Sequence, residues 1–245
     1  MSMQLIIDIG NTMIKSYVFE SDKIVVSDID SNDNWHSFLE KILISYPQIQ
    51  IAIVSDVKKS FSDELNKLLH QINVIYCSAD LKLPFQTFYK PRIQLGSDRI
   101  ALLASCCLHY PNKDVLIIDL GSCITYDWID SKGIHQGGSI SPGFTMRYKS
   151  MNDYSGTLPL LDFERSKNPV ENSTKKAMHS GVYYGILNEI EGIIRWHHNK
   201  IDNLTVILTG GDAERLPKSF KNSIFAHSNF LAKGLKYILA INTIS

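Results

Sequence analysis

Apolar and polar positions follow the same order in two parts of the chain. An apolar run at residues 4–9 ends in a Gly-Asn-Thr turn, and two more strand-like runs follow at 13–20 and 23–29. Short polar breaks between such runs predict an antiparallel meander of three strands. The second half repeats the pattern, with strands expected at 114–119, 124–130 and 133–140.

Helical spacing alternates with β-branched runs after each predicted meander, which indicates α/β layers. After the first meander, helices are expected at 35–46, 60–70 and 98–109, strands at 50–54 and 73–77, and irregular chain at 78–96. After the second, Ser141-Pro142-Gly143 opens a helix. A long helix from about 175 to 198, a strand at 204–208 and a last helix at 229–241 complete the prediction.

An internal repeat supports this division. Ile6-Ile7-Asp8-Ile9-Gly10 and Ile117-Ile118-Asp119-Leu120-Gly121 share one pattern 111 positions apart. A repeat of this size predicts two similar α/β halves, 1–111 and 112–245, with the boundary near Pro111. Because strands end in Asp-x-Gly turns in both halves, we expect the halves to face each other across a cleft.

Composition excludes several classes of protein. The 245 residues are 44% hydrophobic and 20% charged, and their formal net charge is zero, so no polyanion-binding surface or nucleic-acid partner is indicated. No apolar run approaches the ~20 residues of a membrane span, and the N-terminus does not resemble a signal peptide. We therefore expect a cytoplasmic protein without a membrane partner. The four cysteines form no C-x-x-C pair, which argues against a zinc site.

The turn after the first strand is a candidate phosphate site. In the segment Asp8 to Lys15, Gly10 permits a tight turn whose backbone N–H groups can point at one anion. Asn11 and Thr12 add side-chain donors, and Lys15 adds a positive charge. Asp8 is expected to hold the waters of a Mg²⁺ ion. The alternative is an ordinary polar hairpin turn with an exposed lysine.

Two more glycine turns follow strands. Asp119-Leu120-Gly121-Ser122 is the second copy of the first turn, and Thr209-Gly210-Gly211 is expected to lead into a helix. Glycines there permit a phosphate or a planar base to approach the backbone, although each turn alone also fits a plain connection. Neither a P-loop nor a G-x-G-x-x-G motif is present, so P-loop kinases and Rossmann dehydrogenases lose their main support.

Gly96-Ser97-Asp98-Arg99 opens the helix expected at 98–109. Asp98 is a candidate general base that orients a hydroxyl and accepts its proton, and Arg99 is a candidate partner for a substrate carboxylate. The alternative is that Ser97 or Asp98 caps the helix and that Arg99 is solvated. Tyr89 has a structural alternative as a buried aromatic, and Thr174 as a helix cap.

Together these motifs resemble the signature of type III pantothenate kinase, of the acetate and sugar kinase/Hsp70/actin superfamily. The matches run in order from residue 8 to residue 211, and their combination is specific although no single motif is. They are Asp8-Ile-Gly-Asn-Thr-x-x-Lys15, Gly96-x-Asp-Arg99, Asp119-x-Gly-Ser-x-x-Thr125, Gly137-Gly-x-Ile-x-Pro-Gly143 and Thr209-Gly-Gly211.

The resemblance implies two ribonuclease H-like halves of the actin-like ATPase fold, flanking a nucleotide cleft. It implies ATP-dependent phosphorylation of pantothenate to 4'-phosphopantothenate, the first step of coenzyme A synthesis, by a homodimer. Asp98 would be the proton acceptor and Asp119 the ligand of a monovalent cation, K⁺ or NH₄⁺. The residues implied to bind ATP with Mg²⁺ are Asp8, Ile9, Gly10, Asn11, Thr12, Met13, Ile14, Lys15 and Ser122. Those implied to contact pantothenate are Tyr89, Gly96, Ser97, Asp98, Arg99 and Thr174, the last serving the neighbouring subunit's pocket.

One position departs from the family pattern. The family usually has Thr-Ala after Asp-x-Gly, whereas this chain has Ser122-Cys123, which keeps the hydroxyl and loses a methyl group. Two alternatives stay open: another small-molecule kinase of the same superfamily, and a non-catalytic regulator on the same fold. Retention of Asp8, Lys15, Asp98, Arg99 and Asp119 together argues against the regulator.

Overall fold

The computed structural model describes residues 3–31, 35–57, 62–217, 220, 223–226 and 229–243, and its contacts divide the chain into two compact units. The first unit comprises residues 1–111, 133–135 and 229–245, and the second comprises 112–132 and 136–228. One break between the units falls between Pro111 and Asn112. The last helix, however, packs with the first unit, although the sequence suggested that it belongs to the C-terminal half.

The first unit contains a five-stranded sheet in the order β3-β2-β1-β4-β5. Its strands are β1 (Met3–Ile9), β2 (Met13–Glu20), β3 (Lys23–Ser31), β4 (Ile49–Asp56) and β5 (Asn73–Tyr76). Its helices are α1 (Trp35–Ser45), α2 (Ser62–Leu68), α3 (Ser97–His109) and α6 (Phe230–Thr243). These elements match the predicted ones to within a few residues, and positions 60 and 61 of the predicted second helix lie outside the described residues.

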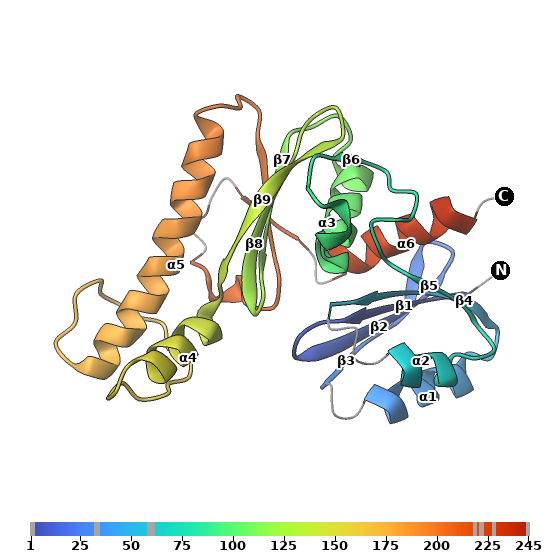
Figure 1. The fold of residues 1–245 in the computed structure, drawn as a ribbon, viewed down its shortest axis with the longest axis horizontal. Coiled ribbons are helices and arrows are strands. Elements are labelled where there is room, and N and C mark those ends of the chain that lie inside the picture. The colour runs from blue at the N-terminus through green and yellow to red at the C-terminus, as the bar shows by residue number, and fades with distance from the viewer. Residues whose placement is uncertain are drawn as a thin grey trace. The chain divides into compact units, whose positions relative to one another are not determined.

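Strand alternation decides what each face of this sheet contacts. Leu5, Ile7 and Ile9 share one face and pack with buried residues of α1 and α2. Ile6 and Ile53 point to the opposite face, where α3 and α6 lie (Figure 1). Asp8 and Ser55 have the same parity as Ile6 and Ile53, so the polar ends of β1 and β4 face the side of α3.

The second unit repeats this topology. β7 (Val115–Leu120), β8 (Cys123–Ile129), β9 (Ile134–Pro142), β10 (Thr205–Thr209) and β11 (Ser223–Phe225) lie in the order β9-β8-β7-β10-β11. In both units, the central strand has an antiparallel hairpin neighbour and a parallel neighbour. The structure thereby confirms the repeat that the sequence predicted, and it adds β11, which the sequence did not indicate.

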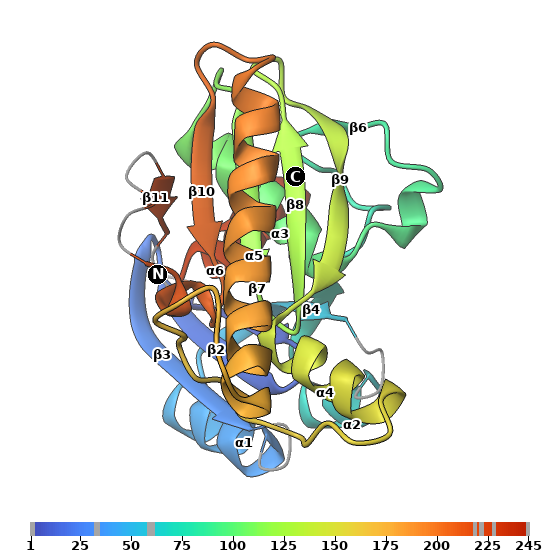
Figure 2. The ribbon, with the colours of Figure 1, turned by 90° about the vertical axis from the view of Figure 1, so that its left-hand side faces the viewer.

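Helix α5 (Thr174–His198) covers one face of the second sheet (Figure 2). Its buried side chains, such as Ile186 and Ile190, pack with Leu116, Ile118 and Leu120 of β7. α4 (Phe144–Tyr154) precedes α5 and joins the same core. Among the described residues, no helix combines the length and apolar character that a bilayer crossing requires.

Short elements complete the chain. The region expected to be irregular contains β6 (Gln86–Thr87), which pairs with the start of β9, and a 3₁₀ turn at Arg92–Gln94. The glycines after β10 lead into a second 3₁₀ turn, Ala213–Arg215, in place of the expected helix.

Candidate active site

Three polar side chains form a row across the first sheet, at the end of its central strand. Asp8 of β1 pairs with Lys15 of β2 in the antiparallel register and with Ser55 of β4 in the parallel register. Directly paired residues point to the same face of a sheet, so the three side chains are neighbours. Asp8 is only 7% exposed and Lys15 is half-buried. The hairpin of the alternative interpretation is present, but Lys15 is half-buried and not exposed.

The turn between β1 and β2 is tight. Gly10 donates its N–H to the carbonyl of Met13, 3.0 Å away, and the side chains of Asn11 and Thr12 between them are exposed. The two donor-bearing side chains expected at the phosphate site therefore lie at the tip of the hairpin, beyond the row of Asp8 and Lys15.

A hydrogen bond links this row to the start of α3. The hydroxyls of Ser55 and Ser97 are 3.0 Å apart, and both side chains are buried. Gly96 occupies the N-cap position and makes no side-chain cap bond, so neither Ser97 nor Asp98 is the cap that one alternative suggested. Ser97 instead fastens the helix start to β4, and the next residue is Asp98.

The carboxylates of Asp8 and Asp98 influence each other. The pKa of Asp8 is raised to about 6, chiefly by burial. Lys15 lowers this pKa, the negative charge of Asp98 raises it, and a hydrogen bond from Ser55 lowers it. The same two carboxylates affect Cys77. Burial, followed by the negative charges of Asp98 and Asp8, raises the pKa of its thiol to about 12. The carboxylates of Asp8 on β1 and Asp98 on α3 thus influence each other beside Lys15.

Asp98 also contacts the backbone at its own helix start. Its Oδ1 accepts the N–H of Arg99 at 2.7 Å, and a Cβ on Gly96 would lie 2.5 Å from the same oxygen. The small residue at position 96 therefore leaves the space that this carboxylate occupies.

Arg99 lies beneath Tyr89. The guanidinium carbon is 4.8 Å from the centre of the Tyr89 ring, and Nη1 donates to the Tyr89 hydroxyl at 3.3 Å. Arg99 is 4% exposed, so the alternative that it is solvated is wrong. His135 is fully buried, and its ring stacks on the ring of Tyr89. The two ring centres are 6.2 Å apart, and the angle between the ring planes is 17°.

In the second unit, the loop after β7 contacts the glycine turn after β10. Asp119 pairs with Thr209 in the parallel register, and Asp212 donates its N–H to the carbonyl of Leu120 at 3.0 Å. Gly210 has a positive φ of 96°, and a Cβ there would lie 2.3 Å from the Leu120 carbonyl oxygen. Only glycine fits this approach, so two motifs 90 positions apart in the sequence form one structure.

The two copies of the repeated strand differ in what faces the aspartate. Lys15 is the antiparallel partner of Asp8, whereas Thr125 is the antiparallel partner of Asp119. Asp119 is half-buried, Ser122 is exposed, and Thr174 is exposed at the first residue of α5, where Ser173 takes the N-cap position instead. The antiparallel partner of the first aspartate is therefore a cation, and that of the second is a threonine.

Sequence reasoning missed Ser55, His135 and Glu189. Ser55 is the next-to-last residue of β4, as Asp8 is of β1, and its place after an apolar run was the available signal in the sequence. His135 and Glu189 carry no local signal, because their partners, Tyr89 for His135 and Tyr126 for Glu189, lie more than 40 positions away.

Comparisons with known proteins agree with this architecture. The family model of type III pantothenate kinase matches residues 4–196. A type III pantothenate kinase from Flavobacterium psychrophilum is 41% identical over 233 residues, which cover 95% of this chain and 97% of the relative. A solved Campylobacter jejuni structure, assigned to the Baf family of transcriptional activators, is 26% identical with a TM-score of 0.66 and covers 97% of this chain and 98% of its own.

A more distant structure confirms the fold alone. The activator of 2-hydroxyisocaproyl-CoA dehydratase from Clostridium difficile, with bound ADPNP, is 14% identical. Its TM-score is 0.56, and the match covers 98% of this chain and 94% of that one. The two-sheet α/β arrangement is the fold seen in actin-like ATPases and sugar kinases. With a family model matching most of its length and a relative at 41% identity, the chain belongs to the type III pantothenate kinase family.

Proposed function

We propose that this chain transfers the γ-phosphoryl group of ATP to the hydroxyl of pantothenate and forms 4'-phosphopantothenate, the first step of coenzyme A synthesis. Besides membership of the family, the observation that carries this proposal is the connection Asp8–Ser55–Ser97. It holds the candidate phosphate loop and the candidate base at one edge of one sheet.

Asp98 is the proposed proton acceptor for the attacking hydroxyl. Phosphoryl transfer requires the nucleophile to be oriented and to lose its proton, and a carboxylate within hydrogen-bond reach does both. Asp98 suits this role because Ser97 anchors its helix start to β4 and because the N–H of Arg99 orients its Oδ1. Residues 8–15 are proposed to bind the phosphates, with Lys15 supplying positive charge.

The environment of Asp8 fits a Mg²⁺ ion. Burial and the charge of Asp98 both raise the pKa of Asp8, and a bound cation would offset both effects. Mg²⁺ prefers oxygen ligands and keeps several waters, which agrees with one carboxylate acting mainly through water. When bound, the ion would neutralise charge on the transferring phosphate.

Asp119 is the proposed ligand of a monovalent cation, K⁺ or NH₄⁺, and Ser122 is proposed to contact ATP. The half-buried carboxylate of Asp119 provides oxygen atoms suited to a hard cation, and a Cβ on Gly210 would lie 2.5 Å from its Oδ1. The hydroxyl of Ser122 is exposed and takes the place of the usual threonine hydroxyl.

Pantothenate carries a carboxylate, and Arg99 is the proposed partner for it. Tyr89 stacks on Arg99 and thereby limits the directions of its guanidinium. Gly96, Ser97 and Asp98 complete the proposed acceptor pocket. We further infer a cytoplasmic homodimer in which Thr174 of each protomer serves the other protomer's pocket.

A coupled ADP assay tests the function. Purified protein is expected to release ADP only when pantothenate, ATP and Mg²⁺ are present, and faster with K⁺ or NH₄⁺ than with Na⁺. A panel of sugars and short carboxylates should give no turnover. Absence of pantothenate-dependent ADP with every cation would overturn the proposal, and binding of ATP and pantothenate without turnover would favour a regulator.

Replacing Arg99 with lysine is expected to raise the KM for pantothenate about tenfold or more, because an ammonium cannot make the paired hydrogen bonds of a guanidinium. The KM for ATP should change little. Steady-state kinetics with each substrate varied separately measure both constants. Arg92→Lys is the matched control, since Arg92 is exposed in the same unit. Equal rises in both KM values would contradict the assignment.

A further inference from the structure

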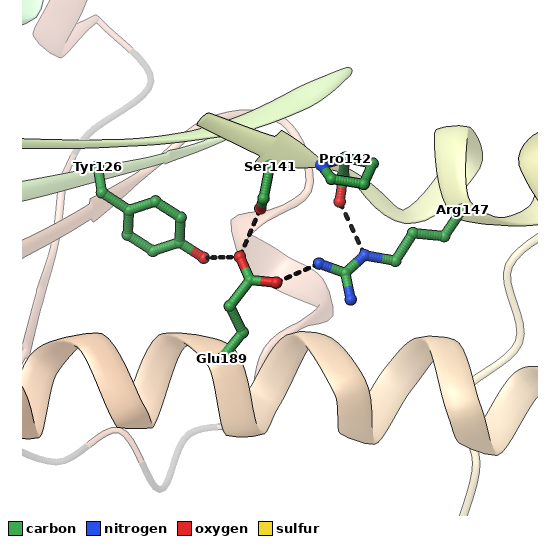
Figure 3. A network of polar contacts seen from close by, with 5 residues as sticks. All are labelled: Tyr126, Ser141, Pro142, Arg147 and Glu189. Carbon is green, nitrogen blue, oxygen red and sulfur yellow. Dashed lines mark hydrogen bonds and ion pairs between the residues drawn. The ribbon is translucent and has the colours of Figure 1, made fainter. Parts of the chain in front are cut away.

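The carboxylate of Glu189 joins four elements of the second unit (Figure 3). It lies on α5 and accepts the hydroxyl of Tyr126 from β8 at 2.6 Å, and the hydroxyl of Ser141 from β9 on the same oxygen. Its other oxygen pairs with the guanidinium of Arg147 from α4. The Nε of Arg147 also donates to the carbonyl of Pro142 at 2.8 Å. One side chain therefore fastens both ends of the corner between β9 and α4.

This carboxylate is held in its charged form. Burial alone would raise the pKa of Glu189, but hydrogen bonds from Ser141, Tyr126 and Arg147, together with the charge of Arg147, lower it below its ordinary value. Tyr126 is 2% exposed, and burial with the hydrogen bond to Glu189 raises its pKa, so it remains a donor. All three partners donate to Glu189, and a carboxylate is the side chain that accepts from three donors at once.

The corner that Glu189 holds is in backbone contact with the loop after β7. Gly143 donates its N–H to the carbonyl of Ser122 at 3.1 Å. A Cβ on Gly143 would lie 2.3 Å from the carbonyl oxygen of Gly121 and 2.8 Å from that of Ser122. The corner and the loop therefore touch without room for a methyl group, and a shift of one displaces the other.

Backbone contacts also hold the opposite side of this loop. Gly210 approaches the Leu120 carbonyl closely, and Asp212 donates its N–H to that carbonyl. On the side of the corner, Gly143 in turn accepts the N–H of Arg147 at 3.0 Å. Arg147 thus contacts Glu189 through its guanidinium and Gly143 through its backbone. Since Gly143 in turn contacts the backbone of Ser122, the carboxylate of Glu189 is connected to the loop after β7.

We propose that Glu189 is a positioning residue for the nucleotide: through Ser141 and Arg147 it sets the corner at residues 141–143, and the corner sets the backbone of Gly121 and Ser122. The inference rests on the proposed function in one respect, the contact of Ser122 with ATP. Glu189 itself does not touch the substrates. Loss of its charge is expected to weaken the binding of nucleotide and to leave the binding of pantothenate unchanged.

Glu189→Gln tests the proposal. Glutamine keeps one acceptor oxygen and places an amide donor among three donors, so the corner loses at least one of its attachments. Titration calorimetry with Mg-ADP is expected to show a Kd about tenfold higher than that of the wild type. The KM for ATP should rise by a similar factor, while the KM for pantothenate stays within twofold.

Two further variants sharpen this test. Glu191→Gln changes an exposed glutamate of the same helix and should leave the Kd for Mg-ADP within twofold. Arg147→Lys keeps a positive charge beside Glu189 but loses the fork that reaches Glu189 and Pro142 together, and should raise this Kd about threefold. If Glu189→Gln does not fold, as judged by circular dichroism, Arg147→Lys decides the question.

An unchanged Kd for Mg-ADP in folded Glu189→Gln or Arg147→Lys would overturn the proposal. So would equal rises in the KM values of ATP and pantothenate, which indicate general loosening of the unit. Because calorimetry with Mg-ADP requires no phosphorylation of pantothenate, wild-type protein that binds Mg-ADP without turning over pantothenate would refute the proposed function and leave the role of Glu189 testable.

Discussion

Asp98→Asn is expected to lower kcat by a factor of about 10² to 10⁴, the range that a positioned general base contributes. Asparagine has nearly the same shape and keeps an oxygen that accepts the N–H of Arg99, which Asp98 accepts at 2.7 Å. The helix start should therefore survive, together with the hydrogen bond between Ser55 and Ser97. What is lost is the capacity to take the proton of the attacking hydroxyl. The coupled ADP assay at saturating ATP and pantothenate measures the loss.

Asp63→Asn is the matched control for this variant. Asp63 is the second residue of α2, as Asp98 is the second residue of α3, and its side chain is exposed. The control removes the same charge from the same position of a helix and should keep kcat within twofold. Unfolding midpoints of both variants should stay close to that of the wild type. A kcat for Asp98→Asn within twofold of the wild-type value would contradict the assignment of the base.

Asp8→Asn is expected to abolish measurable turnover and at the same time to stabilise the ligand-free protein at neutral pH. The folded pKa of Asp8 is about 6, above its ordinary value of 3.8, because burial and Asp98 disfavour the charge. Between these values the folded state binds more protons than the unfolded state, so stability falls as pH rises through this window. Above pH 6, charged Asp8 costs roughly 3 kcal/mol, converting the shift at 1.36 kcal/mol per unit. Asparagine removes this cost.

Urea unfolding at pH 5 and at pH 7.5 measures the effect. The gain in the free energy of unfolding for Asp8→Asn should be clear at pH 7.5 and smaller at pH 5, where wild-type Asp8 is mostly neutral. Asp28→Asn, an exposed change on β3 of the same sheet, should shift neither value. In parallel, Mg²⁺ should no longer strengthen the binding of ATP to Asp8→Asn. Lower stability of this variant than of the wild type at pH 7.5 would contradict the argument.

Local patterns predicted the elements around the site well. Strands form where β-branched runs end in polar turns, as at β1, β2, β7 and β8. The alternation of apolar and polar side chains and the choice of turn residues depend only on neighbouring positions. The repeat around Asp8 and Asp119 predicted matching topologies, and β9-β8-β7-β10-β11 of the second sheet follow the same order as the five strands of the first. The helix expected after Thr209 is a 3₁₀ turn instead, and β11 was not anticipated, since both are short and depend on their neighbours.

Local patterns did not predict which side chains are buried or which elements pack together. Arg99 reads as a solvated residue in the first turn of a helix, yet Tyr89 and the helix packing bury it. The last helix follows the second half in sequence, yet it packs on α3 of the first unit. Neither outcome is visible within a window of ten or fifteen residues, because each depends on surfaces that meet only after the chain has folded.

The sequence by itself determined the strands, the repeat, the position of each aspartate at a strand end and the family. These depend on the order of side chains along the chain, where the alternation of faces and the demands of tight turns act locally. Only the tertiary structure decided that Ser55 connects Asp8 to the start of α3, that Arg99 is buried under Tyr89, and that Glu189 holds the corner against Ser122. Such contacts join residues tens of positions apart, and their strength comes from burial that no segment provides alone.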